Sequence, residues 1–254
     1  MHFDWAFFWR YLLEPSSIYL HGLWLTLSVS VLCQFFGTVI GLFAALGRLS
    51  SFRSLQAIVR FYTWVMRGTP LLVQVVFIYT ALAAANIFRF NDIDFGLFVL
   101  PGNIQAGMLA LSLNEGAYMA EIIRAAITAI DIGQVEASKS LGMRYHLLMR
   151  RIILPQAARF VIPPLGNEFN SMLKNTTLLS VIGVPELLLA TQMVTSATFK
   201  VFELYTVVAL YYLSLTTLWG MIQRRIELRF SEPHLRPRVS AQPGGWRRLL
   251  STVR

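Results

Sequence analysis

The feature that most constrains this chain is its series of long apolar runs. Each run meets the length of about 20 mostly apolar residues that an α-helix needs to cross a bilayer. Because 56% of the 254 residues are hydrophobic, such runs dominate the sequence. We therefore expect an all-α membrane protein with about five transmembrane helices. The five runs are Ile18–Leu46, Ala57–Ala84, Ile104–Ile130, Val161–Val184 and Phe202–Ile222.

Both ends of the chain differ from the transmembrane domain predicted for residues 18–230. Residues 1–17 are rich in aromatic side chains and include Asp4 instead of a basic start. This pattern predicts an extracytoplasmic interfacial segment and argues against a cleaved signal peptide. Residues 231–254 are rich in proline, glycine and arginine, which predicts a basic, flexible cytoplasmic tail.

Basic residues gather in alternate connections between the runs. Short loops rich in lysine and arginine stay on the cytoplasmic side, so this bias predicts an extracytoplasmic N-terminus and a cytoplasmic C-terminus. The residues that follow the first, third and fifth runs are Arg48, Arg53, Lys139, Arg144, Arg150, Arg151, Arg224, Arg225 and Arg229.

The net charge of +9 does not indicate nucleic-acid binding, because the excess lies where the orientation rule places it. A single cysteine, Cys33, excludes an internal disulfide and a paired-cysteine metal site. The four histidines are scattered, so we expect no metal site. The chain also has no GxxxxGK[ST] loop and no GxSxG motif. We therefore expect no enzymatic activity, and any ATP-driven work must come from a partner.

The connection between the third and fourth runs, residues 131–155, differs from a plain linker. Ala137 to Met143 are compatible with a short helix, with Leu141 and Leu148 on a shared face. Gly142 permits a sharp turn that a residue with a Cβ would resist. Pro155 lies where a new helix can start. A short, stiff helix–turn–helix at the membrane surface is the expected result.

This connection resembles the EAA motif of ABC importer permeases. The motif is EAA, three residues, G, nine residues, I, one residue and LP, and this chain departs from it only at Ser138. The matching residues are Glu136, Ala137, Gly142, Ile152, Leu154 and Pro155. Three further segments, Arg67–Gln74, Glu115–Ile127 and Pro163–Leu188, resemble the polar amino acid uptake branch of that family.

The resemblance implies a type I ABC importer permease fold, whose EAA loop is a coupling helix that docks into a separate ATP-binding subunit. Glu136, Ala137, Ser138 and Gly142 would then contact that subunit or shape the loop. It also implies ATP and Mg²⁺ bound by the ATPase and not by this chain. An identical or paralogous second permease, an extracytoplasmic solute-binding protein and the lipid bilayer are the other expected partners. The resemblance also implies a location in a bacterial inner membrane.

The fourth run carries a stripe of polar residues. At about 100° per residue, the stripe covers about a third of the helix. Polar groups inside a span are costly in lipid and usually face the protein interior or a water-filled path. The stripe is therefore a candidate solute path for a zwitterion, and the alternative is a Glu168–Lys174 pair with amides that join helices. Its members are Asn167, Glu168, Ser171, Lys174 and Asn175.

Polar residues in the second and third runs have a gating or a packing role in our interpretation. Arg67 can extend its charge toward the cytoplasm, and Thr69-Pro70 predicts a kink. In the third run, Glu121 and Arg124 are one turn apart and can pair.

Together these features predict a permease subunit that imports a polar amino acid or similar small zwitterion by alternating access. Two other classes remain open at this stage. One is a secondary transporter driven by an ion gradient, and the other is a membrane scaffold without transport. Internal repeats typical of many secondary transporters are not detected, and a scaffold does not need the polar stripe.

Overall fold

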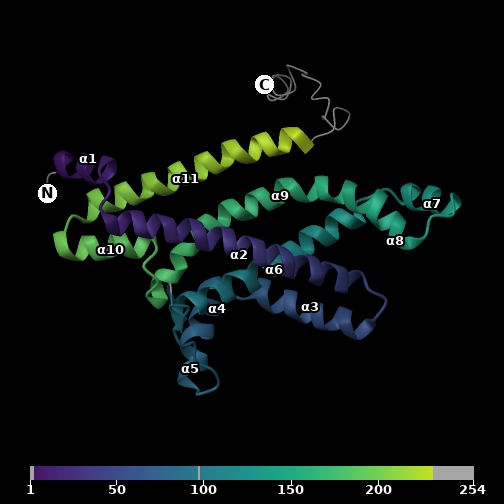
Figure 1. Cartoon of the computed structure of the whole chain (residues 1–254), viewed down its shortest axis with the longest axis horizontal. Helices are drawn as coiled ribbons and strands as arrows, with labels where there is room; N and C mark the ends of the chain where they lie inside the picture. The colour runs from purple at the N-terminus through teal and green to yellow at the C-terminus, as the bar shows by residue number, and fades with distance from the viewer. Residues whose placement is uncertain (1–2, 97, 231–254) are drawn as a thin grey trace, which may run out of the picture.

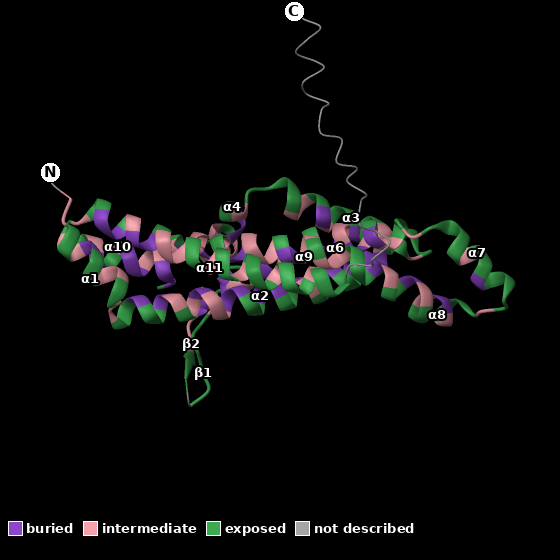
Figure 2. Cartoon of the chain, turned by 90° about the horizontal axis from the view of Figure 1, so that it is seen from above, coloured by how far each residue is buried: buried purple, intermediate pink, exposed green. Residues whose placement is uncertain are grey.

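The computed structural model describes residues 3–96 and 98–230 (Figure 1). Helices dominate this part of the chain. One β-hairpin, whose two strands are each two residues long, projects from the side of the bundle (Figure 2). The elements are α1 (Trp5–Leu13), α2 (Ser17–Leu49), α3 (Arg53–Gly68), α4 (Leu71–Val76), α5 (Leu82–Ala84), β1 (Ile93–Asp94), β2 (Val99–Leu100), α6 (Gly102–Thr128), α7 (Ile132–Ser140), α8 (Tyr145–Leu148), α9 (Leu154–Asn175), α10 (Leu187–Thr198) and α11 (Val201–Phe230).

The centre of the bundle is α6, which packs against α2, α3, α4 and α9. Its longest contact is with α2, and small residues make that contact close. Gly37 and Gly41 of α2 lie against Glu115 and Met119 of α6, with no room for a Cβ. Lipid offers no hydrophobic drive between helices, so close backbone approach is what holds such a pair together.

The helices formed by the five predicted runs differ in whether each is long and apolar enough to span a membrane alone. By length and composition, α2 and α11 can each span a membrane alone, and two bent helix pairs can each form one further span. The third run forms the continuous helix α6, but polar residues such as Asn114 and Glu115 make α6 less apolar than the other spans. Both residues are buried between helices and therefore do not face lipid.

The second run is broken and not merely kinked. Helix α3 and the α4–α5 segment meet at 107° around Thr69 and Pro70. Proline removes a backbone donor, and the break leaves carbonyls that need partners. Gln74 supplies them: its Nε2 donates to Met66 O at 2.8 Å and to Thr69 O at 3.1 Å. The side chain thereby stabilises the bend inside the bundle.

The fourth run is also longer and more irregular than the sequence predicts. A π-helical turn, Met149–Ile153, joins α8 to α9, so Pro155 lies in the first turn of α9 within a continuous helical segment. After α9 the chain tightens into a 3₁₀-helix, Thr176–Ile182, and turns at Gly183 with φ +77°. The segment then meets α10 at 51°.

The predicted interfacial segment forms α1, which packs against α11 at the end of the bundle opposite α7 (Figure 1). Phe8 is buried there, whereas Trp5 and Trp9 remain exposed. Asp4 caps α1 by accepting from the Phe7 amide at 3.0 Å, and it also accepts from Lys200 Nζ at 3.0 Å. The predicted tail, 231–254, lies outside the described residues.

This cap makes the docking of α1 depend on pH. The Phe7 amide and the Lys200 ammonium hold the pKa of Asp4 below its usual range. The stabilisation is therefore present above the unfolded value of about 3.9, and it is lost as the pH falls through the lower folded value. We expect the hydrogen-exchange protection of α1 to fall modestly below about pH 4, because exposed ion pairs contribute little.

The control is Asp4→Asn, which keeps a side-chain oxygen for the cap and removes the titrating group. Its α1 protection factors should vary less than those of wild type between about pH 3 and pH 6, because only Glu203, which accepts from the Asp4 backbone amide at 2.9 Å, still titrates at this cap. A wild-type acid transition that persists unchanged in this variant contradicts the assignment to Asp4.

Candidate translocation cavity and coupling loop

The predicted stiff connection is present as α7, a left-handed turn and α8. Asp131 caps α7 by accepting from the Gly133 amide at 2.7 Å. Gly142 follows the helix with φ +73°, a conformation that L-residues other than asparagine and aspartate rarely adopt. Figure 1 shows this connection at the far end of the bundle, beyond the neighbouring helices.

The four predicted coupling residues have different environments. Glu136, Ala137 and Gly142 are exposed, as are their neighbours Lys139 and Ser140. Ser138 is buried, and its Oγ donates to Gln134 O at 2.6 Å. Ser138 therefore supports the inner face of α7, which leaves the other three accessible to a partner.

The expectation that Leu141 and Leu148 share a face is wrong. Leu141 is 82% exposed, whereas Leu148 is 2% exposed, because the turn at Gly142 reverses the chain between them. Ile132 and Tyr145 are also mostly exposed on this connection. The loop therefore offers an apolar surface that no described part of the chain covers.

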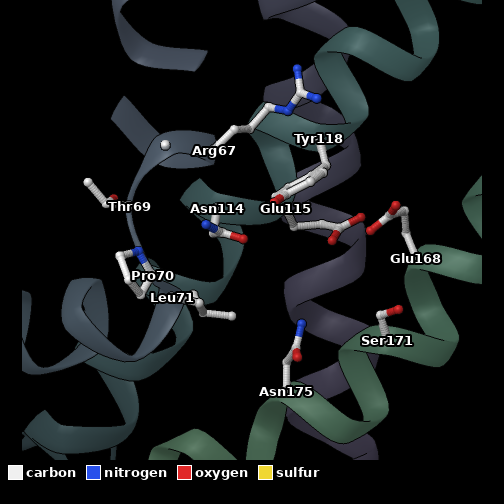
Figure 3. A pocket seen from close by; sticks show the side chains of 11 residues that line it. Arg67, Thr69, Pro70, Leu71, Asn114, Glu115, Tyr118, Glu168, Ser171 and Asn175 are labelled. Carbon is white, nitrogen blue, oxygen red and sulfur yellow. The ribbon is translucent and has the colours of Figure 1, made fainter. Parts of the chain in front are cut away.

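A cavity of about 640 Å³ lies beside the break between α3 and α4. Polar and charged side chains from three helical segments surround it (Figure 3). The lining residues are Arg67, Gly68, Thr69, Pro70, Leu71, Asn114, Glu115, Tyr118, Glu168, Ser171 and Asn175.

The predicted polar stripe of α9 is split by this cavity. Glu168, Ser171 and Asn175 line it, but Asn167 and Lys174 do not. At about 100° per residue, Glu168 and Asn175 lie on one side of Ser171, and the other two lie on the opposite side. The stripe is about a third of the helix wide, so its two edges face different surroundings.

The two remaining stripe residues lie outside the lining of this cavity. Asn167 Oδ1 accepts from Gln223 Nε2 of α11 at 3.2 Å, so Asn167 joins two helices. Lys174 is exposed, and within the described chain no ion pair connects it to Glu168. Of the contacts that the alternative interpretation expects, the described residues contain the helix-joining amide of Asn167 and not a Glu168–Lys174 pair.

The cation of the cavity is Arg67, at the end of α3. Its guanidinium lies 5.3 Å from the centre of the Tyr118 ring. Thr69 and Pro70 form the neighbouring wall, so all three residues of the predicted gate-or-packing group in the second run line the cavity.

Helix α6 supplies cavity residues that the sequence interpretation missed. Glu115 is 4% exposed and accepts from Gln34 Nε2 at 2.7 Å. Figure 3 shows its carboxylate directed toward that of Glu168. Asn114 Nδ2 donates to Gln74 Oε1 at 3.0 Å. The adjacent polar residues Asn114 and Glu115 inside an apolar run were the sequence signal that could have identified these cavity residues.

Glu121 and Arg124 lie outside the cavity lining. Arg124 pairs with Glu121 at 2.9 Å, as their one-turn spacing predicts, and Arg48 of α2 approaches the same carboxylate at 3.6 Å. The three residues connect α6 to the end of α2, which favours packing over gating.

A model of the family described as "binding-protein-dependent transport system inner membrane component" matches residues 37–232. The chain belongs to this family. It is 37% identical over 229 residues to the glutamine transport system permease protein GlnP of Escherichia coli K12, covering 90% of this chain and 98% of that protein. It is also 37% identical over 222 residues to the arginine transport system permease protein ArgU of Corynebacterium glutamicum, covering 85% and 69%.

Solved structures agree with this family assignment. One, described as an amino acid ABC transporter with histidines, matches with a TM-score of 0.79 and 37% identity over 90% of this chain and 100% of that chain. The methionine ABC transporter MetNI in inward-facing form, at 19% identity, covers 86% of this chain and 99% of that chain with a TM-score of 0.66, which shows the shared fold.

Membership decides between the classes left open by the sequence. The chain is a multi-pass inner-membrane permease subunit of a binding-protein-dependent ABC importer, with the type I importer fold. In this family ATP is hydrolysed by separate subunits, so the chain is not itself an ATPase. The secondary-transporter and scaffold interpretations are therefore set aside.

Proposed function

We propose that this permease imports a polar amino acid or a similar small zwitterion by alternating access, and that the cavity beside the α3–α4 break is part of the path. The observation that carries the proposal is the presence of Arg67 and Glu168 on different walls of one cavity. The relatives named for glutamine and arginine transport, and the amino acid transporter of similar structure, support the amino acid class.

The lining suits the two charges of an amino acid. Arg67 offers a planar guanidinium for the solute carboxylate. Glu168, with Glu115 beside it, offers carboxylate oxygens for the solute ammonium. Ser171 and Asn175 add neutral polar groups to the lining.

The proposal includes partners and an orientation. Two ATP-binding subunits hold ATP and Mg²⁺ and move the permease through the exposed face of α7. A second permease completes the enclosed path, and an extracytoplasmic binding protein delivers solute. The basic connections lie toward one end of the bundle and α1 lies at the other, which supports an outer N-terminus and a cytoplasmic C-terminus (Figure 1).

Arg67→Met tests the cavity. Hydrogen bonds to charged groups contribute about 1.5–3 kcal/mol, so we expect uptake to fall about tenfold or more. The measurement uses the complex of permease, ATPase and binding protein in proteoliposomes, with radiolabelled glutamine, arginine and histidine tested separately. Glu168→Gln should produce a comparable loss while the complex still assembles.

The matched control is Lys174→Met, which removes one positive charge from a side chain outside the cavity. We expect uptake within about twofold of wild type, as for most surface substitutions. Normal uptake by Arg67→Met, or an equal loss in both variants, contradicts a solute path at this cavity.

A further inference from the structure

A second groove lies on the outer side of the same helix break. Its volume is about 630 Å³, and it is bounded by α3, α4, the π-helical turn Phe77–Ala81 and α6. Several of the residues that line it are about half exposed. They are Val65, Met66, Thr69, Val73, Gln74, Phe77, Ile78, Leu82, Phe88, Phe90, Leu109 and Leu113.

The chemistry of the lining is almost entirely apolar. Among the described lining residues, only Thr69 and Gln74 have polar side chains, and these are occupied with each other: Gln74 Nε2 donates to Thr69 Oγ1 at 2.8 Å. Membrane helices that pack together use glycine, alanine and serine to bring backbones close. None of the described residues that line this groove is of these types. Bulky, half-exposed side chains fit a flexible hydrocarbon better than another helix.

The size of the groove also fits a hydrocarbon chain. An apolar cavity of about 150 Å³ holds one benzene molecule, so about 630 Å³ accommodates a considerably longer apolar ligand. Each methylene group of such a chain that is buried adds to the binding free energy. In a membrane-embedded helix pair, the abundant ligand of this kind is a lipid tail.

An arginine adjoins two residues that line the groove. Arg89 is exposed and lies between Phe88 and Phe90 in the chain; both phenylalanines line the groove, and their ring centroids are 4.9 Å apart. Arginine side chains lay their stems along apolar surface and keep the guanidinium in a polar layer. An apolar groove with a cation adjoining its lining residues matches an amphiphile with an anionic headgroup.

We propose that this groove binds one acyl chain of an anionic phospholipid, with the headgroup phosphate paired to Arg89. Thr69 borders both the groove and the polar cavity, so the lipid tail supports the α3–α4 break from the side opposite the cavity. The site takes a membrane component and is separate from the solute path. It does not depend on which solute is carried.

Native mass spectrometry of the purified permease–ATPase complex tests the proposal. The complex is mixed with palmitoyl-oleoyl-phosphatidylglycerol or palmitoyl-oleoyl-phosphatidylcholine, and retained lipids are counted. We expect wild type to retain the phosphatidylglycerol preferentially. Leu109→Trp fills the groove and should remove one retained lipid per permease. Arg89→Gln should reduce the preference for the anionic lipid about fivefold, the effect of one basic residue near a lipid headgroup.

Two control variants separate the groove from the general lipid surface. Leu32 of α2 is 42% exposed and Leu109 is 43% exposed, so Leu32→Trp changes a comparable position outside the groove. Arg53→Gln removes an exposed arginine from the far end of α3. Both controls should retain lipid as wild type does. Leu109→Trp with unchanged lipid retention overturns the proposal.

The competing occupant is a second permease. Cys33 is the single cysteine and is buried, so Leu109→Cys introduces one accessible thiol. If two permeases crosslink through position 109, the groove is a subunit interface and the lipid proposal is wrong. Modification of the introduced thiol by a lipid-soluble maleimide without crosslinking supports the lipid.

Discussion

Gly41→Val should abolish the assembled permease. A Cβ at position 41 would lie 2.5 Å from Met119 Cβ and 2.9 Å from the backbone nitrogen of Ala120. The obstruction includes backbone of α6, which cannot move aside as a flexible side chain can. Since α2 and α6 form the central pair of the bundle, separating them exposes buried polar groups such as Glu115. We expect at least a tenfold loss of detergent-extractable, monodisperse complex, because core overpacking costs about 1–3 kcal/mol or more.

Gly220→Val is the matched control. Gly220 also lies inside a long helix, α11, but a Cβ there would meet nothing within 4 Å. Both variants carry the same change of helix propensity, so the difference between them isolates the α2–α6 contact. Size-exclusion chromatography of the two complexes makes the comparison. Equal yields would show that α2 and α6 are not packed as closely as described.

The α2–α6 contact also shows what the sequence could reveal. Gly37 and Gly41 form a GxxxG step, a spacing typical of closely packed membrane helices that does not identify the partner helix. The partner is α6, whose own Gly116 faces Ile40. Which helices meet depends on the three-dimensional arrangement, and spacing within one helix does not contain it.

The cavity shows the limit of the same reasoning. A period of 3.6 residues grouped five polar residues of α9, but helix rotation decides which edge of that group faces Arg67. Lys174 and Asn167 lie on the edge away from this cavity, while Glu115 lines it from a different helix. The proline at position 70 indicated that the helix is interrupted there. It did not indicate the angle of 107° between the two helices, which the hydrogen bonds of Gln74 across the break help to stabilise.

Gly142→Val should uncouple ATP hydrolysis from uptake without unfolding the permease. Gly142 has φ +73°, and a Cβ there would meet nothing within 4 Å, so the penalty is backbone strain alone. Such strain costs about 1–3 kcal/mol, which changes the population of the turn by a factor of roughly 5 to 150. The turn sets the direction of α8 relative to α7, and the accessible residues Glu136 and Ala137 then no longer face a docked partner together. Uptake in proteoliposomes should fall to about a tenth of wild type or less, while the yield of assembled permease stays normal.

Gly142→Asn separates conformation from size. Asparagine tolerates the left-handed region far better than valine and has a larger side chain than alanine. If the turn conformation carries the coupling, Gly142→Asn should keep most of the uptake, with Gly142→Ala between the two. Equal losses in all three variants would instead indicate that the partner needs open space at position 142. Normal uptake by Gly142→Val would show that the connection between α7 and α8 does not transmit motion from the ATPase.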